Sequence, residues 1–335
     1  MEDNRKSESN KLRFRKTCDD RFRYLVAMVA LSALLSVASG CQRLQVGNRH
    51  GNGNGLSKLA DKLTASNDRD WKPDLAVLPW AEASGNLITV RNIRNTQYAN
   101  ADHYLVKHYD RTFDVSTIEK ADYIVCPFNS AAALAHTMIS FGLNDGTHIC
   151  VSAEVRKEKT EDYSAVQGLG RKFELMYVVA DERDLIGART KHRATDVYVY
   201  PTVATPAQAQ ALFVDVMERV NQLALKPEFY NTLTNNCTTN IKSHVNRLAG
   251  NRIKYDWRVL LPSYSAKYAY DLGLLDNSIP FEDLQSLSLV NDLSNEHLET
   301  TDYSTRIRGR RPLISRLAER NGVGETSSSS EVQLR

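Results

Sequence analysis

The sequence lacks a strong charge of either sign, an internal repeat and any long hydrophobic run. Lysine and arginine (43) exceed aspartate and glutamate (40) by three, and the basic residues are spread along the chain. So small an excess argues against a nucleic acid partner. The longest apolar run covers residues 24–38, short of the roughly 20 residues that a spanning helix needs. The composition, 42% hydrophobic and 25% charged, is typical of one large globular domain or two small ones.

The apolar run belongs to an N-terminal leader. It follows a basic segment and ends in VASGC, which places small residues before Cys41. This order is typical of a secretory signal peptide. We therefore expect residues 1–41 to be a signal peptide with a lipobox, Cys41 to carry a lipid, and the rest of the chain to be exported and periplasm-facing. An uncleaved signal anchor or a plain cleaved peptide is the alternative. An aspartate after the lipidated cysteine would favour retention in the inner membrane. Because Gln42 stands there, we expect the protein at the outer membrane of a Gram-negative-type bacterium.

The remainder divides into four predicted regions. Residues 42–70 contain the run VGNRHGNGNGL, which is typical of a flexible linker. Residues 71–276 carry the strand and helix patterns of a main folded domain. Residues 277–321 form a C-terminal extension, and the polar, serine-rich residues 322–335 predict a disordered tail.

A single cysteine stands at a predicted helix start. The segment NTLTNNCTTNI places Asn235 and Asn236, both good N-cap residues, directly before Cys237. Apolar residues then recur at helical spacing (Ile241, Val245, Leu248), and Gly250 marks the end. A thiol in the first helical turn is favoured as thiolate by the unpaired N–H groups and the helix dipole. Cys237 is therefore a candidate nucleophile. The alternative is a buried apolar cysteine on a core stripe.

A predicted hairpin supplies a second chemical group. Residues 135–142 and 147–156 have strand patterns, and Asn-Asp-Gly between them is a strong turn signal. If the turn has three residues, His136 faces Glu154 and Met138 faces Ser152; a two-residue turn would send Glu154 to the other face. The carboxylate is then placed to orient the imidazole as a base. Ser140 and Ser152 are candidate supporting residues.

The other strands and helices indicate an α+β domain. Strand patterns at residues 87–90, 123–128, 173–180 and 196–201 precede a helix that Thr205 caps, with Pro206 at its first position. This helix and a loop then lead to the helix of Cys237. Strands followed by helices are typical of the α+β class.

Two groups of charged residues have competing interpretations. Arg91, Arg94 and Arg156 are candidate contacts for an anionic substrate group, but arginines of this kind more often pair with acids. The cluster Asp-Glu-Arg-Asp at residues 181–184 reads as a solvated turn with internal ion pairs rather than a metal site, because no histidine or cysteine ligand set lies near it in the sequence. We expect no metal and no cofactor.

Two further cysteines flank the strand of His136. Cys126 and Cys150 would form a disulfide or remain buried thiols in an exported protein. Each lies in an apolar strand pattern, which favours buried thiols.

Several of these segments together resemble a known family. RNIRN (91–95), AHTMISFGLNDG (135–146), VSAEVRKE (151–158), YVVADERDLIGART (177–190) and EFYNTLTNNCTTNI (228–241) are similar to the Lnb N-terminal periplasmic domain, over roughly residues 71–276. The resemblance implies a bacterial, exported thiol enzyme linked to lipoprotein N-acylation. It also implies a permuted papain-like (NlpC-like) fold, with an antiparallel sheet packed against the nucleophile helix, Cys237 as nucleophile and His136 as base. Glu154 rests on the hairpin geometry alone.

The sequence also differs from that family. Full-length Lnb proteins continue into a multi-span membrane region, whereas no apolar run of about twenty residues follows Cys237 here. We expect a membrane lipid or lipoprotein as substrate, with a lipid anchor or an integral-membrane partner in place of that region.

The expected reaction is thiol-dependent acyl transfer or amide hydrolysis. Cys237 would form a thioester, while its own N–H and an amide of Asn235 or Asn236 hold the oxyanion. The alternatives are a non-catalytic envelope lipoprotein that binds lipid or peptidoglycan, and a papain-like peptidase or amidase.

Overall fold

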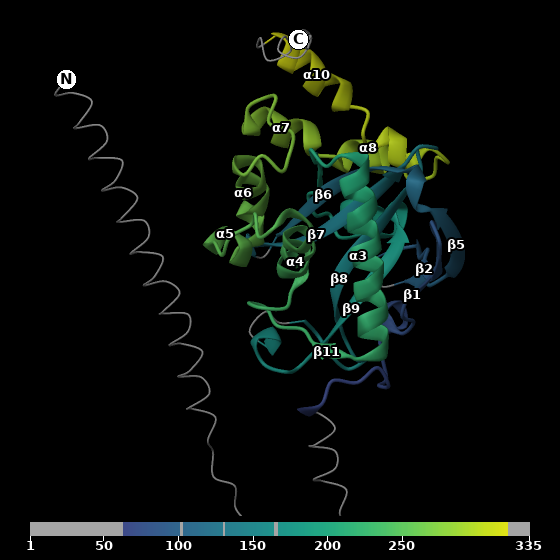
Figure 1. The fold of residues 1–335 in the computed structure, drawn as a ribbon. Coiled ribbons are helices and arrows are strands. Elements are labelled where there is room, and N and C mark those ends of the chain that lie inside the picture. The colour runs from purple at the N-terminus through teal and green to yellow at the C-terminus, as the bar shows by residue number, and fades with distance from the viewer. Residues whose placement is uncertain (1–62, 101–102, 130, 164–166, 321–335) are drawn as a thin grey trace, which may run out of the picture. The chain divides into compact units, whose positions relative to one another are not determined.

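The computed structural model describes residues 63–100, 103–129, 131–163 and 167–320 (Figure 1). The predicted signal peptide, Cys41, most of the predicted linker and the predicted tail lie outside the described residues. The strands are β1 (Trp80–Ser84), β2 (Leu87–Arg94), β3 (Gln97–Tyr98), β4 (Tyr104–Leu105), β5 (His108–Asp114), β6 (Ile118–Phe128), β7 (Ala131–Leu143), β8 (His148–Arg156), β9 (Glu174–Asp181), β10 (Tyr198–Pro201) and β11 (Glu228–Phe229).

Most of the helices follow the strands, in the second half of the chain. The α-helices are α3 (Pro206–Leu225), α4 (Cys237–Ala249), α5 (Trp257–Leu260), α6 (Ser265–Asp271), α7 (Phe281–Ser288), α8 (Asn291–Glu296), α9 (Tyr303–Arg306) and α10 (Arg311–Arg320). The 3₁₀ turns are η1 (Pro73–Leu75), η2 (Val115–Thr117), η3 (Gln167–Leu169) and η5 (Pro262–Tyr264), and η4 (Arg183–His192) is a π-helix.

One large sheet forms the centre of the fold. Its order is β1-β2-β9-β8-β7-β6-β10, with β5 paired to β2 and β11 paired to β9. Its pairings are antiparallel except between β2 and β9, which run parallel. The predicted α+β class is confirmed. The sheet is mixed rather than wholly antiparallel.

The predicted register of the β7–β8 hairpin is confirmed. Met138 pairs with Ser152 and Gly142 with His148. The turn has three residues, because the Leu143 N–H donates to Thr147 O at 2.9 Å. Gly146 in this turn has φ of 81°, a value that glycine adopts without strain. This register puts His136 and Glu154 on one face of the sheet.

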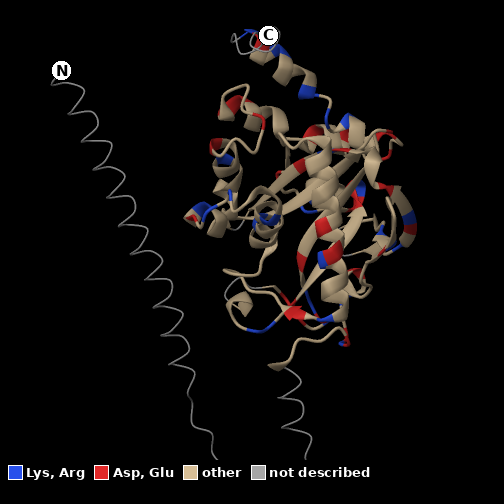
Figure 2. Ribbon diagram, in the orientation of Figure 1, with Lys and Arg blue, Asp and Glu red and all other residues tan. Residues whose placement is uncertain are grey.

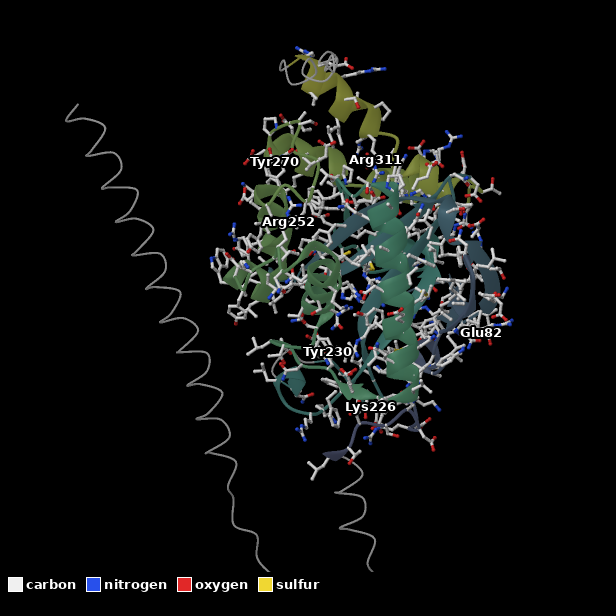
Figure 3. All side chains as sticks on the ribbon, in the orientation of Figure 1. Glu82, Lys226, Tyr230, Arg252, Tyr270 and Arg311 are labelled. Carbon is white, nitrogen blue, oxygen red and sulfur yellow. The ribbon has the colours of Figure 1, made fainter. Side chains whose placement is uncertain are left out.

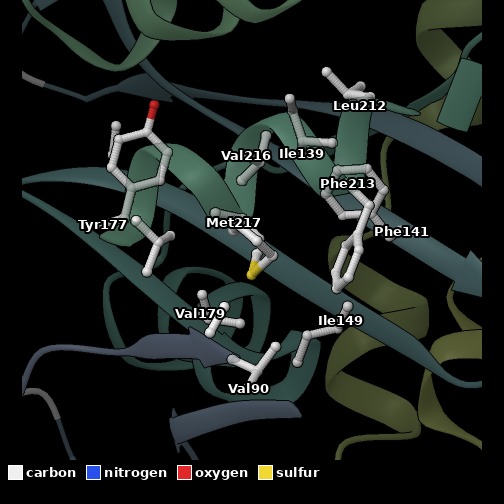
Figure 4. Close-up of a cluster of buried hydrophobic side chains, with 14 of the residues drawn as sticks. Val90, Ile139, Phe141, Ile149, Tyr177, Val179, Leu212, Phe213, Val216 and Met217 are labelled. Carbon is white, nitrogen blue, oxygen red and sulfur yellow. The ribbon is translucent and has the colours of Figure 1, made fainter. Parts of the chain in front are cut away.

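Helices α3 and α4 cover the other face of the sheet. The predicted start of α3 is confirmed, with a Thr205–Gln208 capping box and Pro206 at the first position. Aromatic and aliphatic side chains of α3 pack on those of the central strands (Figure 4). The labelled residues of this core are Val90, Ile139, Phe141, Ile149, Tyr177, Val179, Leu212, Phe213, Val216 and Met217.

Residues beyond 276 belong to this folded unit rather than to a separate extension. Val290, Leu298, Tyr303 and Ile307 are all at most 7% exposed and pack with η4 against the face of the sheet that carries His136. On the side of β6 and β10, α6, α7 and α10 contribute to a third apolar cluster. The sequence boundary at residue 276 is therefore not a structural one.

The acidic cluster at residues 181–184 is not a solvated turn. Glu182 and Asp184 are each 1% exposed, and their partners come from distant segments. Arg94 donates to both carboxylate oxygens of Asp184 at 2.9 and 2.8 Å. Arg308 donates to Glu182 at 2.8 Å. Basic and acidic residues are dispersed over the ribbon (Figure 2), and the two pairs described here are buried.

Arg308 bridges two buried carboxylates. It also donates to Asp122 at 2.8 Å, and Asp122 forms a second ion pair with Arg311 at 2.6 Å. Burial raises the pKa of Asp122 and of Glu182, but the arginine charges more than offset it and hold both pKa values below their ordinary range. Ser140 donates to Glu182 in the same cluster, so it supports this ion network rather than the site of Cys237.

Replacing Arg308 is expected to destabilise the protein strongly. Arg308→Ala leaves two buried carboxylates with one remaining arginine, which should lower the free energy of unfolding by about 3–5 kcal/mol at pH 7. Arg306→Ala, which removes an exposed pair with Asp302, should change it by less than about 1 kcal/mol. Chemical denaturation measures both.

The difference between these variants should depend on pH. Both carboxylates have lowered pKa values, so their stabilising contribution exists above the ordinary carboxylate pKa and is lost as the pH falls through the folded-state values. A deficit of Arg308→Ala that stayed constant into strong acid would contradict an ionic role for Arg308.

Candidate functional site

Cys237 is the first residue of α4. Asn236 caps the helix: its side chain accepts from the Thr239 N–H at 2.8 Å, and Thr239 Oγ1 accepts from the Asn236 N–H at 2.8 Å. Gly250 ends the helix, as predicted, and it adopts the left-handed conformation. The Cys237 N–H is among the first-turn donors that have no partner within the helix. This N–H lies at the positive end of the helix dipole, where a negatively charged oxygen is stabilised.

The amides of Asn235 and Asn236 hold the loop before α4. The Asn235 amide donates to Phe229 O at 3.0 Å, and the Asn236 amide donates to Thr232 O at 2.6 Å. Their backbone N–H groups bond to Asn231 O and Thr239 Oγ1. The amides of both residues thus have protein partners in this structure. These residues position Cys237.

His136 lies on β7 and is held by the neighbouring strand. Its Nε2 lies 2.6 Å from Ser152 Oγ and 3.2 Å from Glu154 Oε1. Ser152 in turn donates to Glu154 at 2.8 Å. His136 is 9% exposed and Ser152 is fully buried. Since Nε2 is engaged on this side, Nδ1 is the ring nitrogen left for a thiol.

Arg189 completes the arrangement and was not identified from the sequence. It is carried by the π-helix η4, and its guanidinium lies 3.0 Å from Glu154 Oε1. The same guanidinium donates to Leu185 O within the helix at 2.8 Å. The only sequence signal was its position within the segment YVVADERDLIGART. π-helical turns are rare and occur often at functional sites.

Most of α4 covers the face opposite His136, but the pairing of β7 with β8 ends at Met138–Ser152. Beyond this point Cys237, at the start of α4, interacts with His136. Thr137 and Thr238, the residues after His136 and Cys237, contact through their hydroxyl oxygens at 3.1 Å. Burial raises the pKa of Cys237, but interaction with His136, assisted by Thr137, reverses the shift and lowers the pKa to about 7. The lowered pKa of Cys237 thus depends on His136, the residue that the sequence predicts as its base.

The electrostatics of the site favour a charged pair. Burial lowers the pKa of His136, but the charges of Glu154 and Cys237 outweigh it and raise the pKa to about 9. Burial likewise raises the pKa of Glu154, yet His136 and Arg189 hold it well below its ordinary value. These directions favour a thiolate and an imidazolium beside an ionised carboxylate near neutral pH.

Two tyrosines stand close to the thiol. Tyr230 is 7% exposed and its pKa is raised by burial and then by the charge of Cys237. It packs edge-on against Tyr163 with ring centroids 6.5 Å apart. Figure 3 labels Tyr230 on the loop that leads to α4. Both tyrosines therefore lie near enough to Cys237 for its charge to raise their pKa values.

The three candidate substrate arginines have protein partners. Arg94 is paired with Asp184 as described above, and exposed Arg91 pairs with Glu82 and Asp110. Arg156 is 1% exposed and donates to Leu75 O and Ala76 O, with its guanidinium over the Trp71 ring at 4.2 Å. The structure thus assigns all three to folding contacts. Sequence position alone could not separate these roles.

The two flanking cysteines are buried free thiols, as the strand pattern predicted. Cys126 is 1% exposed and Cys150 fully buried, and neither is joined to Cys237. Burial raises the pKa of both. Cys237 is therefore the one described cysteine with a lowered pKa. Over the described residues, no group of three or more histidine, cysteine or acidic side chains is arranged to hold a metal ion.

The fold and the site define a class: an α+β domain with a helix-start thiol paired to a strand imidazole. A family model for the Lnb N-terminal periplasmic domain matches residues 105–263. This stretch of the chain belongs to that family, and the match spans His136, Glu154 and Cys237. The chain thus carries a periplasmic domain, which indicates an exported protein.

Other comparisons give no further relative. No curated protein and no solved structure matches the chain. None of the helices in the described part of the chain is long and apolar enough to cross a membrane.

The thiol should titrate near neutrality. The alkylation rate of Cys237 by iodoacetamide is expected to rise as the pH increases through about 7, because the thiolate is the reactive form. His136→Asn should move this midpoint upward by at least one unit, since burial would then be unopposed. Arg306→Ala, remote from the site, should leave the midpoint unchanged. Mass spectrometry of the labelled peptide measures the rate, and a wild-type midpoint near 9 would contradict the pairing.

Proposed function

We propose that this protein is an exported, thiol-dependent acyltransferase or amidohydrolase of the cell envelope. The observation that carries the proposal is the Cys237–His136–Glu154–Arg189 arrangement, in which burial raises the pKa of the thiol but His136 reverses the shift. A buried cysteine that served only packing would keep a raised pKa, as Cys126 and Cys150 do. The site fits covalent catalysis better than simple packing.

The reaction proceeds in two steps. The Cys237 sulfur attacks an ester or amide carbonyl, its proton having passed to His136. The C–O or C–N bond then breaks, and His136 returns the proton to the departing alcohol or amine. An amine (transfer) or water (hydrolysis) next attacks the thioester, loses a proton through His136 and releases the Cys237 thiolate.

Each neighbour has a distinct part in these steps. The Cys237 N–H, at the start of α4, stabilises the oxyanion in both steps. Glu154 orients His136 through Nε2 and stabilises its charge, and Arg189 holds Glu154 in place. In the sequence, the strand that carries the histidine precedes the helix that carries the cysteine, which fits a permuted papain-like arrangement. The acceptor of the acyl group is an amine, because thioesters react readily with amines.

The location of the site suggests its substrates. The family is a periplasmic domain, and the sequence leader predicts a lipid on Cys41. A domain tethered in this way meets membrane lipids and lipoproteins as acyl donors and acceptors. We therefore propose acyl transfer on a lipoprotein or lipid, with an integral-membrane partner supplying contacts outside this chain. Peptide or amide hydrolysis is the second reading of the same thiol chemistry.

The proposal is tested by trapping the acyl group. Protein purified from bacterial membranes is incubated with phospholipid and a diacylated lipopeptide, and intact-protein mass spectrometry follows acyl groups on Cys237 and on the peptide amine. Cys237→Ala should abolish both, with at least about a 10³-fold loss. His136→Ala should reduce turnover by about 10²–10⁴-fold.

Two variants complete the design. Cys150→Ala, a buried thiol outside the site, should retain activity if it folds, which thermal denaturation checks. Glu154→Gln should lower the rate and shift its pH profile, because His136 loses its charged partner. Full acyl turnover by Cys237→Ala would rule the mechanism out. The absence of any acyl adduct on folded wild-type protein with a reactive thiol would instead favour a binding module.

A further inference from the structure

The apolar stripe of α4 lines a cavity rather than a filled core. Sequence spacing predicts Ile241, Val245 and Leu248 as core positions. In the structure Ile241 and Val245 are half-buried and Leu248 is 46% exposed. All three border a cavity of about 180 Å³ between α4, α6 and the sheet. The cavity is open to solvent on the side of Leu248, and a concave apolar surface of this kind is typical of a ligand-binding site.

Apolar side chains from five parts of the fold form the cavity wall. They come from α4, from α5, from α6 with the residues after it, from the sheet, and from the segment between β10 and α3 with the first half of α3. Those used here are Ile139, Val203, Leu212, Ile241, Val245, Leu248, Val259, Ala269, Leu272 and Leu275. Figure 3 labels Arg252 and Tyr270 on the side of the molecule where α4 and α6 lie.

The charged residues that border the cavity are already engaged by protein groups. Asp122 is bound by Arg308 and Arg311, and Arg252 donates to Leu272 O at 2.7 Å. Lys242 lies over the Tyr255 ring at 5.6 Å. The cavity therefore suits an uncharged hydrocarbon rather than a headgroup or an ionic ligand.

One end of the cavity lies one residue along the chain from the nucleophile. Thr238, the residue after Cys237, is part of the wall. Cys237, Ile241, Val245 and Leu248 follow one another at helical spacing, so the thiol stands at the end of the same face. From Thr238 to Leu248 the helix rises by about 15 Å. A chain attached at the sulfur has an apolar path of that length along α4.

We propose that this cavity binds the single linear acyl chain of the group carried by Cys237. The thioester carbonyl lies at the start of α4, and the chain extends past Ile241 and Val245 toward Leu248. The inference rests on the proposed function for the chemistry at the thiol, and adds where the chain is held and what limits its length. An apolar cavity of similar size, about 150 Å³, is known to bind hydrocarbon ligands.

A maleimide series tests the cavity without requiring turnover. Intact protein reacts with N-ethyl-, N-butyl-, N-octyl- and N-dodecylmaleimide, each of which adds the Cys237 thiolate to its double bond and gains a solvent proton. The rate constant at Cys237, corrected for reaction with free cysteine, should rise by up to about fourfold per methylene buried. It should level off when the chain exceeds the cavity. Equal corrected rates for all four reagents would overturn the proposal.

Cavity-filling variants locate the effect. Ala269→Phe and Val245→Trp fill the cavity from opposite walls. Each should lower the ratio of the N-octylmaleimide rate to the N-ethylmaleimide rate, here called the octyl preference, by at least about tenfold. The N-ethylmaleimide rate should stay within about twofold. Ala211→Phe, on the exposed face of α3, is the matched control and should behave as wild type. Thermal denaturation shows which of the two filling variants is folded. If a folded filling variant still reacts preferentially with N-octylmaleimide, the chain binds elsewhere and the proposal is overturned.

Failures of the two proposals can be told apart. A chain-length preference at Cys237 without acyl adducts would refute acyl transfer while leaving an alkyl-binding cavity. Acyl adducts with no chain-length preference would keep the enzyme and refute the cavity. Loss of the preference upon adding an apolar peptide, but not upon adding decanoic acid, would identify a peptide as the occupant and overturn the acyl assignment.

Discussion

The charge of the half-buried Glu154 is the constraint on which the site depends. An ionised carboxylate that is largely removed from water is costly unless other groups compensate it, and both compensating groups come from elsewhere in the chain. His136 reaches it from β7 and Arg189 from η4. The carboxylate thus connects the hairpin with the π-helix, and it keeps His136 charged. A charged His136 in turn makes a thiolate at Cys237 accessible near neutral pH.

The relative sizes of two effects show why His136 is decisive. The helix start also favours the thiolate, but a dipole contributes about 0.3–1 kcal/mol in most settings. Lowering the Cys237 pKa from its ordinary value of 9.0 to about 7 requires roughly 3 kcal/mol, in addition to the cost of burying the charge. The dipole alone is therefore too weak. Cys237 depends on the hairpin, and so on a register that places His136 and Glu154 on one face.

The local features of the site were predictable from the sequence, whereas its long-range partners were not. The Asn-Asp-Gly turn specifies the register, and the Asn-Asn-Cys-Thr-Thr segment specifies the start of α4, because both depend on nearest neighbours. Arg189 has no local signal, since its partner Glu154 is 35 positions away. The roles of Arg94 and Arg308 were hidden for the same reason. Their acids, Asp184 and Glu182, looked like a surface turn until the fold brought the arginines to them.

The stripe on α4 shows a different limit of sequence reasoning. Helical periodicity indicates that Ile241, Val245 and Leu248 face something apolar, but not whether that surface is protein. Here α6 stands far enough from α4 to leave a cavity. The dense packing under α3 shows that this chain can fill a core where needed (Figure 4). The same helix therefore has a structured polar start, set by Asn236 and Thr239, and an unfilled apolar body. A thioester needs this combination, because its carbonyl requires fixed donors while its chain requires only apolar space.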